Sequence, residues 1–124
     1  FRNKATGVKG GVRLYGRIIG VGVDEKRAGV AEDPSLLNRL QAQLISANPN
    51  ITRVMFLIED SNRNAPYTAA TRAIKTRDFM TAEVSSIPWG TLTSMARRIL
   101  KAKKNVGAVY YDITPKPPAT IEFE

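Results

Sequence analysis

The segment IPWGTLTSMARRIL, residues 87–100, decides how this 124-residue chain is expected to fold. From Leu92 onward its apolar residues recur at helical spacing, which places them on one face of an α-helix: Leu92, Met95, Ala96, Ile99 and Leu100. The opposite face carries Arg97, Lys101 and Lys104, with Arg98 on its flank. The pattern predicts a helix that packs one side against a core and offers the other to an acidic partner.

Strands are predicted on both sides of this helix. Phe79–Ser86 reads as a strand that ends at the Ile87-Pro88-Trp89 corner, and a second strand runs from the turn at Asn105-Val106-Gly107 to Thr114. Two interpretations of Trp89 stay open. It closes the hydrophobic core as a staple, or it anchors a partner, since Trp and Arg are enriched at interfaces.

The N-terminal part predicts a strand followed by a helix. Val12–Val23 alternates, so Leu14 and Ile18 face one side and Arg13, Tyr15 and Arg17 face the other. Asp24–Ala31 is read as a polar loop. Asp33-Pro34 suits a helix start, with Asp as N-cap and Pro at the first helical position. The helical stripe that follows ends at Asn48-Pro49-Asn50 and consists of Leu36, Leu37, Leu40, Leu44 and Ala47.

A central strand is predicted next. Ile51–Ile58 is apolar on both sides from Val54 onward, which is typical of a strand covered on both faces. Glu59–Arg77 is read as a long polar connection. The order β-α-β-β-α-β predicts an α+β fold of the ferredoxin-like type, an antiparallel sheet with two helices on one face.

The predicted organisation has one main compact domain over residues 12–118. Within it, residues 12–50 form an N-terminal β-α extension and residues 51–118 a β-β-α-β unit. Residues 1–11 are expected to form a flexible basic arm, and residues 119–124 a tail or short edge strand. No stretch approaches the roughly 20 apolar residues that a membrane-spanning helix needs. The first residue is Phe, so we read the chain as a fragment or a processed product.

Composition removes most catalytic chemistry. The chain has no cysteine and no histidine, which excludes thiolate nucleophiles, the usual zinc ligands and histidine proton transfer. We therefore expect a protein that is not an enzyme and has neither catalytic residues nor a metal site. The net charge of +8 favours an acidic partner: nucleic acid, an anionic membrane or an acidic protein surface. A basic surface kept for solubility is the alternative.

One further surface is a candidate for nucleic acid. Arg13, Tyr15 and Arg17 would form a basic and aromatic stripe on an open sheet face, which is typical of single-strand binding. The aromatic signature of RNA-recognition sheets is absent, however.

Several of these motifs resemble the small C-terminal domain of phycobilisome linker polypeptides, also found as the rod-capping linker. The resemblance covers about half the chain: the strand Thr52–Glu59, the loop Asn62–Arg77, the Ile87-Pro88-Trp89 corner, Arg98-Ile99 in the helix, and Val106–Pro115. It implies a structural linker that orders a light-harvesting assembly on the cytoplasmic or stromal side of the thylakoid. Its partners would be acidic phycobiliprotein subunits.

For a linker, the candidate partner-binding residues are those of the basic helix and its corner: Trp89, Arg97, Arg98, Lys101 and Lys104. For nucleic acid, Arg13, Tyr15 and Arg17 would act together with the same helix. Without cysteine the chain cannot hold a thioether-linked bilin itself, so a partner's bilin would lie near Trp89, Tyr110 or Tyr111. A second resemblance, to a ferredoxin-like ribosomal protein, rests on Leu92, Met95, Ala96 and the Asn105-Val106 turn. It implies RNA binding as the alternative function.

Overall fold

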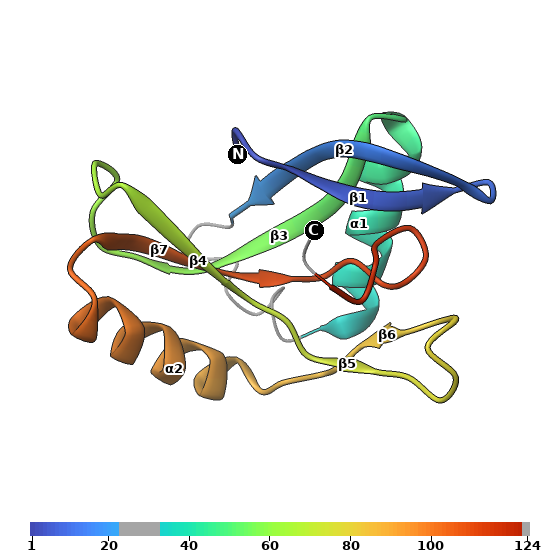
Figure 1. Cartoon of the computed structure of the whole chain (residues 1–124). Coiled ribbons are helices and arrows are strands. Elements are labelled where there is room, and N and C mark those ends of the chain that lie inside the picture. Colours follow the sequence, from blue (N-terminus) through green and yellow to red (C-terminus); the bar gives the residue numbers. More distant parts are fainter. Residues whose placement is uncertain (23–32, 123–124) are drawn as a thin grey trace.

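A mixed five-stranded sheet with two helices forms the body of the molecule (Figure 1). The computed structural model describes residues 1–22 and 33–122. Along the sheet the strand order is β1-β2-β3-β7-β4, and a separate hairpin pairs β5 with β6. The elements are β1 (Lys4–Lys9), β2 (Val12–Val21), α1 (Pro34–Ala47), β3 (Ile51–Asp60), β4 (Tyr67–Thr71), β5 (Ile74–Lys75), β6 (Glu83–Val84), α2 (Trp89–Ala102) and β7 (Val106–Asp112).

The sheet is built from two parallel pairs. β2 is parallel to β3, with α1 between them in the chain, and β4 is parallel to β7, with α2 between them. The two pairs meet where β3 and β7 run antiparallel. The predicted antiparallel ferredoxin-like sandwich is therefore wrong, because each helix connects neighbouring parallel strands and the order in the sheet differs.

The third main strand lies elsewhere than the sequence predicts. β4 falls inside the predicted polar connection Glu59–Arg77, and Phe79–Ser86 contributes only the short β6. Phe79 itself lies in a loop with a φ of 61°, and it is largely exposed together with Met80. A short edge strand buries little apolar surface, so β4 lacks the hydrophobic pattern that marks an interior strand.

Residues 4–9 are ordered as β1, whereas the sequence predicts a flexible arm there. β1 and β2 form an antiparallel hairpin whose turn is Gly10-Gly11, with φ values of 55° and 77° that glycine adopts without steric cost. At the other terminus, Ala119 makes a single β-bridge to Gly7 rather than an edge strand. The predicted loop Asp24–Ala31 and residues 123–124 lie outside the described residues.

Both predicted helices are confirmed, and α1 is closed at both ends. The Asp33 carboxylate accepts hydrogen bonds from the backbone amides of Ser35 and Leu36, and Pro34 is the first helical residue. At the C-terminal end, Lys9 of β1 donates to the carbonyls of Ile45, Asn48 and Pro49 at 3.0–3.2 Å. A cation at this end also suits the helix dipole.

The two faces of β3 are buried in different ways. Val54, Phe56 and Ile58 belong to the main hydrophobic core, which both helices cover. Met55 belongs to a smaller cluster with Ala5 and Ile18. The prediction of a central strand covered on both faces is confirmed. Among the described residues, no helix is long and apolar enough to cross a membrane.

Candidate functional site

A buried ion pair joins the two central strands. Arg53 of β3 and Asp112 of β7 have fully buried side chains, and Arg53 Nη1 donates to Asp112 Oδ2 at 2.6 Å. Asp112 Oδ1 accepts from the backbone amide of Thr114 at 2.9 Å. Burying two charges is costly unless they are paired and hydrogen-bonded, and both conditions hold here.

A second arginine shares the same carboxylate. Arg72 Nε lies 3.4 Å from Asp112 Oδ2, and Arg72 Nη2 donates to the Thr114 carbonyl at 3.1 Å. Burial lowers the pKa of Arg72, while the charge of Asp112 acts in the opposite direction. We call Arg53, Arg72 and Asp112 together the arginine clamp.

The arginine clamp holds the C-terminal segment by its backbone. Arg53 Nη2 donates to the Thr120 hydroxyl at 2.9 Å and to the Glu122 carbonyl at 2.5 Å. Arg72 Nη1 donates to the carbonyl of Ile121 at 2.7 Å and also to that of Thr120. Charge-assisted bonds of this kind are short and directional, so residues 120–122 are fixed against the sheet.

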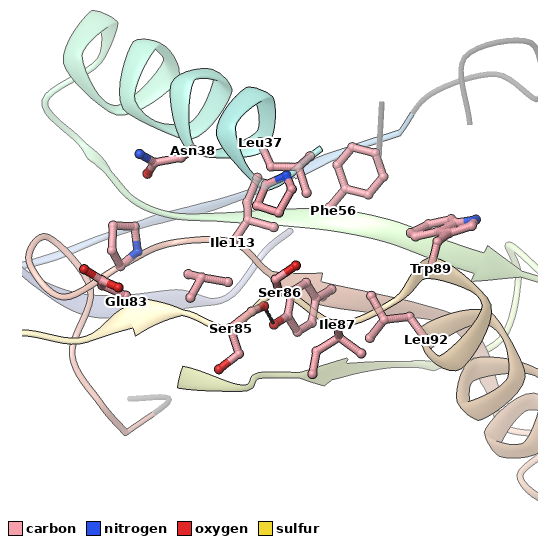
Figure 2. Close-up of a pocket in the computed structure, with 14 residues that line it drawn as sticks. Leu37, Asn38, Phe56, Glu83, Ser85, Ser86, Ile87, Trp89, Leu92 and Ile113 are labelled. Carbon is pink, nitrogen blue, oxygen red and sulfur yellow. Dashed lines mark hydrogen bonds between the residues drawn. The ribbon is translucent and has the colours of Figure 1, made fainter. Parts of the chain in front are cut away.

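An apolar cavity of about 380 Å³ lies on the helix-covered face of the sheet. Its walls come from α1, β3, β7 and the chain from β6 into α2, and we call it the interhelix cavity. Figure 2 shows Asn38 and Glu83 at one end and Phe56, Trp89 and Leu92 at the other. The lining residues are Pro34, Leu37, Asn38, Phe56, Glu83, Val84, Ser85, Ser86, Ile87, Trp89, Leu92, Tyr111, Ile113 and Pro115.

The polar groups of the cavity differ in how they are satisfied. The Tyr111 hydroxyl donates to the Ser85 carbonyl at 2.7 Å, drawn as a dashed line in Figure 2, and lies 3.3 Å from that of Ala73. Burial raises the pKa of Tyr111, so this hydroxyl stays protonated. The Asn38 side-chain oxygen accepts from Gln41 Nε2 at 2.9 Å.

The position of Trp89 has features of both interpretations that the sequence left open, core packing and partner binding. Its ring is partly buried and meets Phe56 edge to face, with centroids 5.9 Å apart. The ring also borders a shallow hollow on α2 with Arg97, Arg98 and Lys101. Arg97 pairs with Glu59 at 3.1 Å, and Lys104 is exposed just beyond the helix. Partner binding by these residues stays a prediction.

The other predicted stripe lies on the β1–β2 hairpin, far along the sheet from α2 (Figure 1). Arg13, Tyr15 and Arg17 are all exposed on β2, as alternation predicts. Arg17 lies opposite Lys4 in the strand register. The structure therefore separates the predicted site residues into two surfaces. Among the described residues, no group of three or more acidic side chains could hold a metal ion.

Sequence reasoning missed the arginine clamp. The sequence pattern places Arg53 in an apolar strand, Arg72 in a polar connection and Asp112 in the last strand, and it indicates no contact among them. For Arg53 and Asp112, the sequence contains a signal that could have predicted a buried ion pair. A charged residue inside a strand that is apolar on both sides must find a buried partner, and Asp112 interrupts the last strand in the same way.

Comparison with known proteins identifies relatives of this chain. The family model described as the GMP synthase C terminal domain matches residues 57–123. A protein of Sulfurisphaera tokodaii, named as a subunit of glutamine-hydrolyzing GMP synthase, is 44% identical over all 124 residues, which cover 30% of that protein. The protein of the same name from Saccharolobus islandicus is 40% identical over the whole chain, 31% of its length. The glutamine-hydrolyzing GMP synthase of Agathobacter rectalis is 39% identical over 81% of this chain and 18% of its own.

These findings overturn several expectations. The chain does not belong with phycobilisome linkers, and neither phycobiliproteins nor nucleic acid is supported as its partner. The expectation that the protein is not an enzyme is wrong as well, because the relatives are named as GMP synthases. The linker resemblance also implied a location at the thylakoid membrane, and the relatives give no support for that location. The motifs did not identify the family, because an apolar strand, a proline corner and an amphipathic helix occur in many unrelated proteins that combine helices with a sheet.

Proposed function

This chain belongs to the GMP synthase C-terminal domain family, and from that premise we propose that it takes part in GMP formation within a glutamine-hydrolyzing GMP synthase. The chain spans about a third of the length of the Sulfurisphaera and Saccharolobus relatives it matches. The activity proposed here therefore belongs to a complete enzyme, to which this chain contributes one part.

The relatives' name indicates the chemistry. Glutamine hydrolysis releases ammonia, and GMP carries one exocyclic amine, on C2 of its purine. The proposed substrate is therefore a purine nucleoside monophosphate with an oxygen at C2. The ammonia nitrogen forms the new bond to C2, the C2–O bond breaks, and in the overall balance the oxygen leaves as water. We place this reaction in the cytoplasm, where free nucleotides are found.

The arginine clamp is the observation that best supports a role for this chain in that reaction. Arg72, Asp112 and the segment they hold lie within the residues that the family model matches. Burying charges costs desolvation free energy. In return, their hydrogen bonds fix the position of the C-terminal segment more closely than apolar packing does. We propose that the clamp fixes the C-terminal segment where the rest of the enzyme meets the nucleotide.

Growth of a guanine-requiring strain tests this proposal. A strain that lacks its own GMP synthase should grow without guanine when it receives the complete protein that carries this sequence. Arg72→Lys keeps the charge but loses the fork of donors that holds residues 120–122. We expect it to lower glutamine-dependent GMP formation by the purified enzyme on the order of 10- to 100-fold, because small misplacements in an active site have effects of this size.

Arg39→Lys is the matched control, since Arg39 is exposed on α1 and away from the clamp. It should leave GMP formation unchanged. Immunoblotting and circular dichroism establish that each variant is present and folded. The proposal fails if the folded complete protein does not restore growth, or if Arg72→Lys and Arg39→Lys form GMP at the same rate.

A further inference from the structure

The loop between β5 and β6 presents two large apolar side chains to solvent. We propose that this loop docks onto the part of the complete protein that lies outside these 124 residues. Phe79 is 68% exposed and Met80 is 73% exposed. Figure 1 shows the loop at the end of the β5–β6 hairpin, which projects from the body of the molecule. Contiguous exposed apolar surface marks interaction sites, whereas single exposed apolar residues are ordinary.

The backbone of Phe79 indicates that the exposed ring has a function. Its φ of 61° lies in the left-handed region, and no other non-glycine residue within the described ranges 1–22 and 33–122 has a positive φ. Bulky residues rarely adopt this conformation, and strained residues cluster at functional sites. The ring is mostly exposed, so its packing within this chain offsets little of the strain. A contact outside the chain supplies the missing stabilisation.

Hydrogen bonds within the loop hold both side chains in place. The Thr76 hydroxyl accepts from the backbone amide of Phe79 at 3.0 Å and donates to the Thr81 carbonyl at 2.6 Å. Asp78 Oδ1 accepts from the backbone amides of Met80 and Thr81 at 3.0 and 3.3 Å. A partner therefore meets a loop that is already ordered, and binding loses less conformational entropy.

Backbone pairing places this loop next to the C-terminal part of the chain. Ala82 and Lys116 exchange backbone hydrogen bonds at 2.9 and 3.0 Å, and Lys116 Nζ donates to the Phe79 carbonyl. Lys116 leads into residues 120–122, which the arginine clamp holds. Docking at this position rests on the proposed function, which brings the rest of the enzyme to residues 120–122. One surface of that remainder can then cover both the segment and the loop.

The remainder of the protein is large enough to provide this surface. The present chain covers 30% and 31% of the Sulfurisphaera and Saccharolobus relatives, so more than two thirds of such a protein lies outside it. Domains of one protein commonly meet through interfaces that combine apolar and polar contacts. Arg77 is exposed beside Phe79 and Met80. The receiving surface is therefore an apolar depression with an acidic side chain at its rim.

Oxidation of Met80 by hydrogen peroxide tests this docking in the complete protein, without substrates. Methionine oxidises according to its exposure, and mass spectrometry gives the rate at each methionine in native and in urea-unfolded protein. A Met80 side chain that nothing covers would oxidise at nearly the unfolded rate. We expect oxidation at least about tenfold slower in the native protein, which corresponds to a docked state in about nine-tenths of the molecules. Met55, which is 1% exposed, is the internal reference for full protection.

Two variants of the complete protein test the part played by the ring. Phe79→Asn removes the ring with a residue that tolerates a φ of 61°, and it should bring Met80 oxidation to within about threefold of the unfolded rate. Val12→Thr is the matched control. Val12 is an apolar residue, 66% exposed, on β2 of the other hairpin, and its replacement should leave Met80 as slow as in the native sequence.

A photoreactive benzophenone amino acid at position 79 identifies the surface that receives the loop. We expect its adducts, located by mass spectrometry, on peptides outside these 124 residues. Adducts confined to the same 124 residues of a second copy would overturn the proposal. So would native Met80 oxidising at the unfolded rate, or Met80 staying slow in Phe79→Asn. None of these measurements involves catalysis, so a protein that restores growth can still fail them, and one that docks can still fail to restore growth.

Discussion

The two faces of β3 show two ways of burying one strand. On the helix-covered face, Val54, Phe56 and Ile58 pack against apolar residues of both helices and β7. On the other face, Arg53 is equally buried but is held by Asp112 and the C-terminal segment. The helix-covered face depends on buried area, which has no direction. The other face also holds the small apolar cluster of Met55, Ala5 and Ile18, but the burial of Arg53 there depends on the placement of individual atoms.

This difference has structural consequences. The apolar face leaves a cavity of about 380 Å³ next to Phe56, because apolar packing can be incomplete without leaving a polar group unpaired. The clamp face brings two arginines to one carboxylate. Removing a member of such a group leaves an uncompensated buried charge. We therefore expect the clamp face to tolerate substitution less well than the helix face.

The largest expected effect follows from removing the shared carboxylate. Asp112→Asn preserves the side chain's shape and an acceptor oxygen, but it leaves Arg53 and Arg72 without their buried counter-charge. We expect the free energy of unfolding to fall by about 3–5 kcal/mol. Urea unfolding of the chain measures this change.

The control for that measurement is Asp60→Asn. Asp60 is exposed and lies 3.8 Å from Arg63, so its loss should change the free energy of unfolding by less than about 0.5 kcal/mol. If the two variants are equally stable, the clamp does not stabilise the fold and the contrast between the faces is lost.

Sequence patterns were sufficient for single elements whose signal is local. The N-cap Asp33, the amphipathic spacing from Leu92 to Leu100, and the apolar run after Val54 each led to an element that the structure confirms. Each of these signals depends on neighbours within one or two turns of chain. Local patterns carry no information about which strands pair, and so the sheet order was wrong.

The arginine clamp escaped prediction for a related reason. Arg53 and Asp112 are 59 residues apart, and Arg72 meets a segment 48 or 49 residues further along the chain. A single charged residue in a strand does not reveal its partner, so only pairing in three dimensions identifies the group. β4 was missed because an edge strand with small and polar residues lacks hydrophobic alternation.

A smaller effect is expected on the helix face. Leu92 is buried on α2 and borders the interhelix cavity, so its outer side already lacks packing partners. Leu92→Ala should lower the free energy of unfolding by about 2 kcal/mol, the low end of the range for such substitutions. Leu100→Ala makes the same change on the same helix, outside the cavity lining, and should cost about 3–4 kcal/mol. Equal losses in urea unfolding would mean that the cavity does not loosen the packing around it.

The smallest expected effect concerns the one hydroxyl that enters this apolar face from β7. Tyr111→Phe removes the hydrogen bond to the Ser85 carbonyl and should lower the free energy of unfolding by about 1 kcal/mol near neutral pH.

Burial raises the pKa of Tyr111 in the folded chain, so the unfolded chain ionises first, at a pH of about 10. The stabilisation by the protonated hydroxyl is therefore complete below that pH and is lost as the pH rises further. Urea unfolding at pH values of about 8 and about 10.5 should show a larger loss for the native chain than for Tyr111→Phe. Burial raises the pKa of Tyr110 too, so the variant should keep part of the loss. An identical pH dependence in both chains would mean that Tyr111 ionises as freely in the folded state as in the unfolded one. The helix face would then admit water at this position, and its contrast with the clamp face would be one of solvent access as well as of packing.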